Sequence, residues 1–333
     1  MTRRNRTIAI SASTAGAAIA LAIGLVVALI GCSSSSTPPA PSAPAPPPSP
    51  TRILSPFTGE PVHALGPVLA VKIDNIKDAR PSTGLRSADI VYVLPVEGGL
   101  SRLMPVFSSH FPPVIGPVRS AREDDLELLR QFGTPAFAYS GAAPHLLPFI
   151  HRARIIDLYA GITRGYFRDP RRVAPHNLYA SSSVLLAQAR GASKASDIGF
   201  RFGPAPAGGR VERSYAVSYP GASFTFRWSA PAGRWLVWMD GAPAMATEGG
   251  QLGGPTVVVQ YTVVRTSRFL EYGSRPPFAE STGSGRAVVL RDGKAFDVKW
   301  ARPTQDSPTV FTLPSGQRMT FAPGQVWVVF AAK

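Results

Sequence analysis

The stretch that decides the fold, residues 71–122, reads VKIDNIKDARPSTGLRSADIVYVLPVEGGLSRLMPVFSSHFPPVIGPVRSAR. It alternates apolar runs with turns that carry Arg, Asp, Asn, Glu and Gly. Apolar runs of this kind are typical of buried strands, and charged residues where such runs end are candidates for a functional site. We therefore expect this stretch to build a sheet and to carry polar groups at the ends of its strands.

Two of these runs, Asp89 to Val96 and Arg102 to Ser109, are joined by Glu97-Gly98-Gly99. A glycine pair between two strands is typical of a hairpin turn, because glycine adopts the positive φ that tight turns require. A loop that approaches a ligand closely is the alternative. The same residues therefore predict a hairpin and leave a ligand contact open.

A helix is predicted to begin at Ser120, with Glu123 three residues later completing a capping box, and to end near Gly133. Arg119 and Arg122 then flank a helix N-terminus, where free N–H groups favour anions. Two interpretations stay open. The arginines bind an anion, or the neighbouring acidic residues simply neutralise them.

A second polar segment follows at residues 164–177. It packs four arginines around Asp169 and ends in His176-Asn177. Charge runs of this kind usually form a solvated face, but the interleaved Gly165, Tyr166 and Phe167 favour a structured loop. We expect this segment to form a second wall of the site that the first stretch begins.

The second half of the chain is dominated by alternating apolar and polar residues, which is typical of half-buried strands. Its expected strands include Thr256 to Arg265, Gln317 to Phe321 and Gln325 to Phe330, and no long helix competes with them. The alternating aromatics from Phe224 to Trp238 predict core packing, with a sugar-binding platform as the alternative. The predicted fold class is α+β, a mixed α/β N-terminal domain at residues 56–200 followed by a mostly antiparallel β C-terminal domain at residues 210–333.

The N-terminus reads as an export signal. Three arginines precede the uncharged apolar segment Ile8–Ile30, and Leu29-Ile30-Gly31-Cys32 matches the bacterial lipobox. A retained membrane helix is the alternative, since the apolar segment is long enough to span a bilayer. We predict a lipoprotein signal peptide at residues 1–31, lipidation of Cys32 and a Ser/Pro/Ala-rich stalk at residues 32–55. The chain is then exported and lipid-anchored on the outer face of the cytoplasmic membrane.

Charge and cysteine content agree with this placement. The formal net charge is +15, which favours anionic partners. Nucleic acid is not expected as a partner of an exported lipoprotein, so an anionic cell-wall ligand or an envelope protein is the candidate partner. Cys32 is the single cysteine, which excludes an intramolecular disulfide, and lipidation accounts for the odd thiol.

Several motifs resemble those of the YerB-like bacterial lipoproteins, a two-domain family of unknown function. They are listed in chain order: IDN at 73–75, ARPSTGL at 79–85, ADIVY at 88–92, VEGG at 96–99, GPVRSAR at 116–122 and APHNLY at 174–179. The resemblance covers nearly all of the chain after the stalk. It departs at Ile76 and Val93, where the family often has His and Glu, which puts a general-base role for either position in doubt. The resemblance implies a family and a layout but no activity.

No standard catalytic constellation is present. The five histidines lack HxxxH or HxH spacing, and there is neither a GxSxG elbow nor a phosphate-binding glycine loop. We therefore predict no metal and no cofactor.

What remains is a set of polar residues that could clamp a carboxylate or phosphate through arginine, or form a structural ion-pair network. The candidate ligand-binding residues are Asp74, Asn75, Arg80, Asp89, Glu97, Arg102, Arg119, Ser120, Arg122, Arg168, Arg172, His176 and Asn177. Three functions are carried forward. They are binding of an anionic envelope ligand, a wall hydrolase or transferase that uses Asp74, Asp89 or Glu97 as acid or base with His176 as the alternative, and a structural partner of another envelope protein.

Overall fold

The computed structural model describes residues 53–271 and 273–333. The predicted signal peptide, Cys32 and most of the stalk lie outside the described residues. These described residues form one compact unit. No helix in residues 53–271 or 273–333 combines the length and the apolar character that crossing a bilayer requires.

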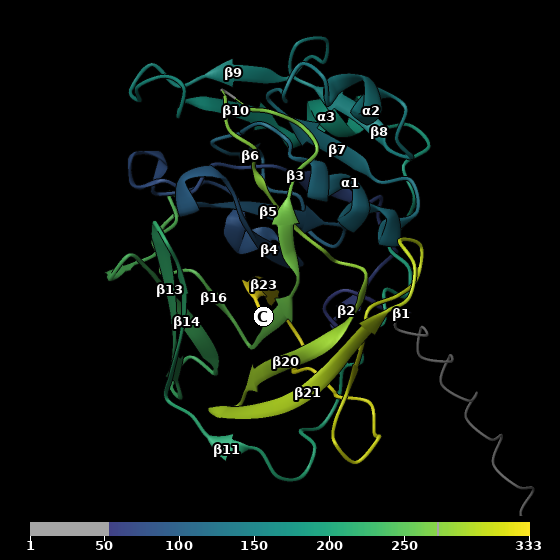
Figure 1. The fold of residues 1–333 in the computed structure, drawn as a ribbon, viewed down its shortest axis with the longest axis vertical. Helices are drawn as coiled ribbons and strands as arrows, with labels where there is room; N and C mark the ends of the chain where they lie inside the picture. Colours follow the sequence, from purple (N-terminus) through teal and green to yellow (C-terminus); the bar gives the residue numbers. More distant parts are fainter. Residues whose placement is uncertain (1–52, 272) are drawn as a thin grey trace, which may run out of the picture. The chain divides into compact units, whose positions relative to one another are not determined.

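An eleven-stranded sheet runs through both halves of the chain (Figure 1). Ten strands lie along it in this order: β11 (Arg210–Val211), β21 (Lys294–Arg302), β20 (Gly283–Arg291), β17 (Thr256–Thr262), β23 (Val326–Ala332), β4 (Ile90–Pro95), β5 (Ser101–Phe107), β3 (Leu69–Val71), β7 (Ala136–Tyr139) and β8 (Ile156–Tyr159). The eleventh, β22 (Val310–Thr312), pairs with β21. Strands of the second half thus continue directly into strands of the first.

The two halves meet where β23 pairs in parallel with both β17 and β4. Every residue of β4 is buried, as is every residue of β23 except the last; β4 is rich in Val, Ile and Tyr, and β23 in Val, Trp and Phe. Such residues suit a strand that is covered on both faces. The antiparallel hairpin β4–β5 confirms the turn predicted at Glu97-Gly98-Gly99, with both glycines at positive φ.

Four smaller sheets complete the strand content. A five-stranded sheet contains β12 (Ser214–Tyr219), β13 (Ala222–Ser229), β14 (Arg234–Met239), β15 (Ala242–Pro243) and β16 (Gly253–Gly254). A three-stranded sheet contains β6 (Val114–Ile115), β10 (Leu178–Ser181) and β9 (Tyr166–Arg168). Two-stranded sheets pair β1 (Ile53–Leu54) with β2 (Pro61–Val62), and β18 (Val264–Thr266) with β19 (Pro277–Ala279).

The described residues form three short α-helices, α1 (Glu123–Leu129), α2 (Leu147–His151) and α3 (Ser182–Gln188). Single turns of 3₁₀ helix occupy Lys77–Ala79, Leu85–Ser87, Glu97–Gly99 and Arg130–Phe132. In Figure 1 the three helices lie near β7 and β8 in the upper part, whereas β20 and β21 lie in the lower part and β13 and β14 at the left.

Alternate residues of the central strands feed two hydrophobic cores, as the period of a strand requires. Val91 and Val93 of β4 belong to the core that also contains Phe224, Phe226 and Trp235 of the five-stranded sheet. Ile90, Tyr92 and Leu94 of β4 belong to the other core, with α1 and α2. Phe224, Phe226 and Trp235 are fully buried, so these three aromatics pack in the core as predicted.

The α+β fold class and the β-rich second half are confirmed, and three details of the sequence analysis are corrected. The helix begins at Glu123 instead of Ser120. Its N-cap is Arg122, whose N–H donates a hydrogen bond to the side chain of Asp125. Gln317 to Phe321 makes only isolated bridges and is not a strand. The run from Thr256 to Arg265 is divided into β17 and β18.

Candidate functional site

Six of the predicted site residues line one cavity of about 280 Å³, which we call the polar cleft. These residues are Asp74, Glu97, Arg102, Arg119, Arg122 and His176. Glu271 and Ser274, from the second half of the chain, line it as well. The cleft therefore collects three arginines, three carboxyl groups and one histidine.

Backbone pairing brings the segments of the cleft together. Past the end of β3, the carbonyl of Lys72 accepts a hydrogen bond from Arg119 N–H at 2.8 Å. Asp74 N–H donates to the carbonyl of Pro117 at 2.8 Å, and Ile73 bridges to Leu103 beside Arg102. Residues 72–75, 102–103 and 117–119 are thereby held side by side.

Asp74 is the centre of one half of the cleft. Its Oδ2 lies 2.8 Å from His176 Nδ1 and 2.9 Å from Arg119 Nε, and its Oδ1 accepts a hydrogen bond from Asn75 N–H at 2.9 Å. Burial favours the neutral acid, but the hydrogen bond with His176 and the charges of Arg119 and Arg102 overcome it and lower the pKa of Asp74. Asp74 is thus an ionised carboxylate that positions His176 and Arg119.

Arg122 organises the other half. Its Nε lies 2.7 Å from Glu97 Oε1, its Nη2 donates to Glu97 Oε2 at 3.0 Å, and its Nη1 lies 3.4 Å from Glu271 Oε1. Burial opposes ionisation of Glu97, yet the hydrogen bond and charge of Arg122 lower the pKa of Glu97. Burial raises the pKa of Glu271, and the neighbouring Glu97 adds to the rise against the opposing charge of Arg122.

Arg102 differs from the other two arginines because none of the ion pairs formed by the described residues includes it. The residue is 8% exposed and lines the cleft, and its one hydrogen bond runs from Nη1 to the carbonyl of Ser120 at 2.7 Å. Burial lowers the pKa of Arg102 to about 10, and the nearby charge of Arg122 acts in the same direction, against the opposing charges of Glu97 and Asp74. Arg102 remains a cation, and most of its N–H donors make no hydrogen bond to a described residue.

Sequence reasoning missed Glu271 and Ser274. These residues close a tight turn in which Glu271 N–H donates to Ser274 O at 2.7 Å and Ser274 N–H donates to Glu271 O at 3.1 Å. Nothing in their local sequence marks a site. The turn reaches the cleft because strands of the two halves share one sheet, and local sequence patterns do not show such long-range pairing.

The other predicted residues support the cleft or lie apart from it. Arg80 and Asn75 hydrogen-bond each other, and Arg80 also pairs with Asp240 at 2.8 Å. Arg172 donates to the carbonyls of Ala79 and Pro81, which fastens the loop behind His176 to the ARPSTGL segment.

Four residues have mainly structural contacts. Arg168 donates to Asn177 Oδ1 at 2.6 Å within that same loop, and Ser120 contributes its carbonyl to Arg102. Asp89 is buried away from the cleft, where it accepts hydrogen bonds from the N–H groups of Ser108 and Ser109 at 2.5 and 2.9 Å. Burial raises the pKa of Asp89 against these hydrogen bonds.

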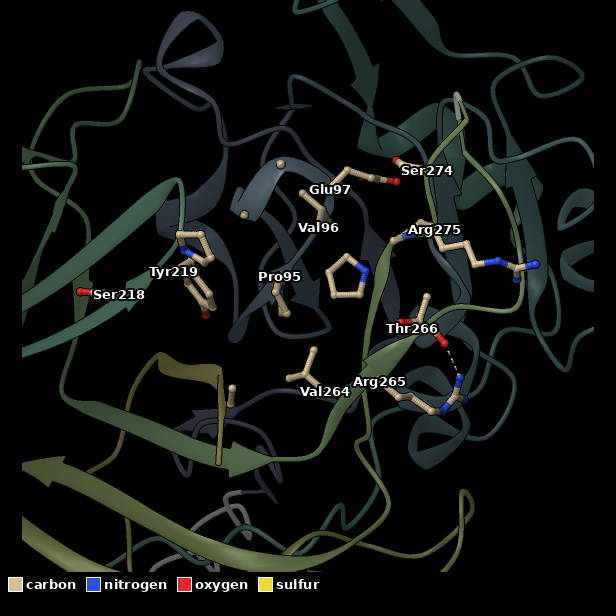
Figure 2. Close-up of a pocket in the computed structure, with 16 residues that line it drawn as sticks. Pro95, Val96, Glu97, Ser218, Tyr219, Val264, Arg265, Thr266, Ser274 and Arg275 are labelled. Atoms are coloured by element: carbon tan, nitrogen blue, oxygen red, sulfur yellow. Dashed lines mark hydrogen bonds between the residues drawn. The ribbon is translucent and has the colours of Figure 1, made fainter.

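A larger cavity of about 530 Å³ adjoins the polar cleft, and the two share Val96, Glu97 and Ser274 (Figure 2).

Within residues 53–271 and 273–333, no group of three His, Cys, Asp or Glu side chains is arranged to hold a metal ion.

Comparison with known proteins identifies the family of the chain. Residues 57–196 match the N-terminal domain, and residues 215–328 the C-terminal domain, of a family described as a protein of unknown function (DUF3048). The chain is 25% identical over 294 residues to "Putative lipoprotein YerB" of Bacillus subtilis (strain 168), covering 83% of this chain and 86% of that protein.

The crystal structure of YerB protein from Bacillus subtilis superimposes with a TM-score of 0.70 at 21% identity, covering 84% of this chain and 96% of that one. It shares the fold. Together, the two domain matches and the relative show that this chain belongs to the YerB-like, two-domain DUF3048 family.

Proposed function

We propose that this protein is an envelope lipoprotein whose polar cleft binds an anionic group of a wall polymer, a glycan or a partner protein. The observation that carries the proposal is Arg102, a guanidinium that is 8% exposed and has no carboxylate partner among the described residues. Asp74 and Glu97 lie close enough to raise the pKa of Arg102, but neither forms an ion pair with it, so the lost hydration of this buried cation is only partly compensated. A carboxylate or phosphate in the cleft supplies a direct counter-charge through the bidentate contacts that arginine prefers.

Arg119 and His176 support the same role. Arg119 pairs with Asp74 through Nε only, and its two Nη groups make no hydrogen bond to a described residue. His176 is positioned by Asp74 through Nδ1, and its other ring nitrogen makes no hydrogen bond to a described residue. Asp74 thereby holds Arg119, an anion donor, and the His176 ring in place beside Arg102.

The acid–base alternative has less support. Asp74 and Glu97 are both paired with arginine, and both pKa values are lowered, so each carboxylate is engaged as an anion. Asp89 is held by backbone N–H groups away from the cleft. A role as a structural partner of another envelope protein is tested by copurification from membranes.

Binding is measured by calorimetry on the full chain in nanodiscs, with methyl phosphate and acetate as probes, and by pull-down of purified wall fractions. Arg102→Gln is expected to weaken binding at least about tenfold, equivalent to about 1.4 kcal/mol. Arg102→Lys restores part of the loss because it keeps the charge. Arg171→Gln is the matched control, since Arg171 is 87% exposed and pairs only with Asp169.

The proposal fails if neither probe nor wall fraction binds the wild-type chain, or if Arg102→Gln and Arg171→Gln bind equally well. Unfolding midpoints of the variants separate a loss of binding from a loss of folding.

The lipid anchor is tested separately. We propose that Cys32 is lipidated and holds the chain on the outer face of the cytoplasmic membrane, which the lipobox and the name of the Bacillus relative support. Cys32→Ala is expected to abolish incorporation of a labelled fatty acid, because Cys32 is the single cysteine of the chain. Unchanged labelling of Cys32→Ala would refute the anchor.

A further inference from the structure

The larger cavity beside the polar cleft has mostly apolar walls. We call it the apolar cavity and define it by Pro95, Tyr219, Val264, Pro276, Pro277 and Ala332. Figure 2 shows Pro95, Tyr219 and Val264 around the opening, with Glu97 and Ser274 at the side shared with the polar cleft. Its volume of about 530 Å³ lies within the range of about 300–1,000 Å³ typical of small-molecule sites.

The charged groups at its rim are engaged elsewhere. Arg265 stacks on Phe278, with its guanidinium carbon 3.5 Å from the ring centroid, and donates to the carbonyl of Thr266 at 3.3 Å. Arg275 donates to the carbonyls of Ser267 and Arg268 at 3.2 and 2.5 Å. Both guanidinium groups point away from the cavity in Figure 2.

Part of the wall is poor in hydrogen-bond donors, whereas Ser218, Thr266 and Ser274 supply hydroxyl groups elsewhere on it. Four of the lining residues are prolines, which have no N–H group, namely Pro95, Pro220, Pro276 and Pro277. The Tyr219 hydroxyl already donates to the carbonyl of Phe330 at 2.7 Å. Along the proline-lined part a peptide or a sugar would leave polar groups unpaired, whereas a hydrocarbon chain needs no such partners.

We propose that the two cavities together bind one amphiphile, with a single anionic head group at Arg102 and Arg119 and an apolar chain in the apolar cavity. This inference rests on the proposed anion-binding function and adds the chemical class of the ligand. The head group is a carboxylate or a phosphate monoester, since arginine recognises both. Val96, Glu97 and Ser274 form the passage between the two sites.

The test compares octyl phosphate with methyl phosphate, and octanoate with acetate, by calorimetry on the full chain in nanodiscs, with empty nanodiscs as the blank. At least one eight-carbon probe is expected to bind about tenfold or more tightly than its one-carbon or two-carbon counterpart, because its chain removes apolar area from water. Val264→Phe, which fills the cavity, is expected to abolish this advantage and to leave methyl phosphate binding unchanged. Val263→Phe is the matched control, because Val263 is the next residue in the chain, is 43% exposed and does not line the cavity.

Each failure is distinguishable. Equal affinities of the long and short probes overturn the amphiphile and leave anion binding intact, whereas no binding of any probe overturns the proposed function itself. A chain-length advantage that survives in Val264→Phe, or is lost in Val263→Phe, also overturns the inference. Tighter binding of an alanine-rich peptide with a free C-terminal carboxylate than of octanoate overturns it as well, because the ligand is then a peptide.

Discussion

Lys72 and Asp125 form an ion pair whose side chains are both completely buried, with Nζ 2.5 Å from Oδ1. Asp125 also accepts a hydrogen bond from Arg122 N–H at 2.7 Å through Oδ2. The pair therefore fastens the end of β3 to the first turn of α1, beside the segments that carry Arg119 and Arg122. This connection explains how a helix of seven residues can hold its orientation beside the polar cleft.

Removing one partner of this pair is expected to be costly. Lys72→Met leaves Asp125 buried without a counter-charge and should lower the free energy of unfolding by about 3–5 kcal/mol. Lys72→Met combined with Asp125→Leu should recover part of the loss, since no charge is left unpaired. Urea unfolding measures both, with Lys194→Met, at an exposed lysine, as control. A loss in Lys72→Met no greater than in the control contradicts this account.

Asp124 gives the stability a pH dependence of predictable sign. Burial and the charge of Asp125 raise the pKa of Asp124 from 3.8 to about 7 in the folded chain. The folded state therefore holds a proton that the unfolded state releases, and this contribution to stability declines as pH rises from about 4 to about 7.

Asp124→Asn cannot titrate, so the stability of the wild type relative to this variant should fall by about 2 kcal/mol between pH 5 and pH 8. Urea unfolding at the two pH values measures the change, with Asp78→Asn, at an exposed carboxylate, as control. A difference that stays constant or grows with pH rules out a raised pKa.

Gly98 and Gly99 form a matched pair for testing the contact between the hairpin tip and the second half. Both have positive φ, 67° and 69°, so alanine at either costs about 1–2 kcal/mol in backbone strain. A Cβ on Gly99 would also lie 2.6 Å from Pro220 Cβ, whereas a Cβ on Gly98 meets nothing closer than 3.8 Å.

Gly99→Ala should therefore destabilise the protein by about 1–3 kcal/mol more than Gly98→Ala. Thermal or urea unfolding of the two variants provides the comparison. Equal losses would show that the hairpin tip and Pro220 can move apart without cost.

The raised pKa of Glu271 leads to a prediction of how anion binding in the polar cleft depends on pH. Its pKa is raised by burial, so lowering the pH through that pKa removes a negative charge from the cleft, and anion affinity should rise. Glu271→Gln should bind methanesulfonate, whose charge is constant in this range, about 3–10-fold more tightly at pH 8, and its affinity should change less with pH. Calorimetry from pH 5 to pH 8 measures this. A pH profile that is the same in both chains contradicts this account.

Much of the fold could be predicted from local sequence patterns. Strands such as β12 and the β4–β5 hairpin follow from apolar alternation and glycine placement, because these features act between near neighbours. The start of α1 was misplaced by three residues, since Ser120 and Glu123 fit a capping box and only the tertiary structure shows that Asp125 does the capping.

The site was predicted in part. Asp74, Glu97, Arg102, Arg119, Arg122 and His176 do gather in one cleft, because they flank strands that become neighbours. Asp89 has the same sequence character but is used to hold the backbone at Ser108 and Ser109. Glu271 could not be predicted, since its approach depends on pairing between strands more than 200 residues apart, such as β4 and β23.

The place of β23 has a consequence for the order in which the protein is made. This strand follows all other described strands in the chain, yet it occupies the middle of the large sheet between β17 and β4. Until it arrives, both neighbours present open edges, which are sites of misassociation. Neither half can finish its own sheet beforehand, so assembly of the polar cleft has to wait for the late-emerging C-terminal segment.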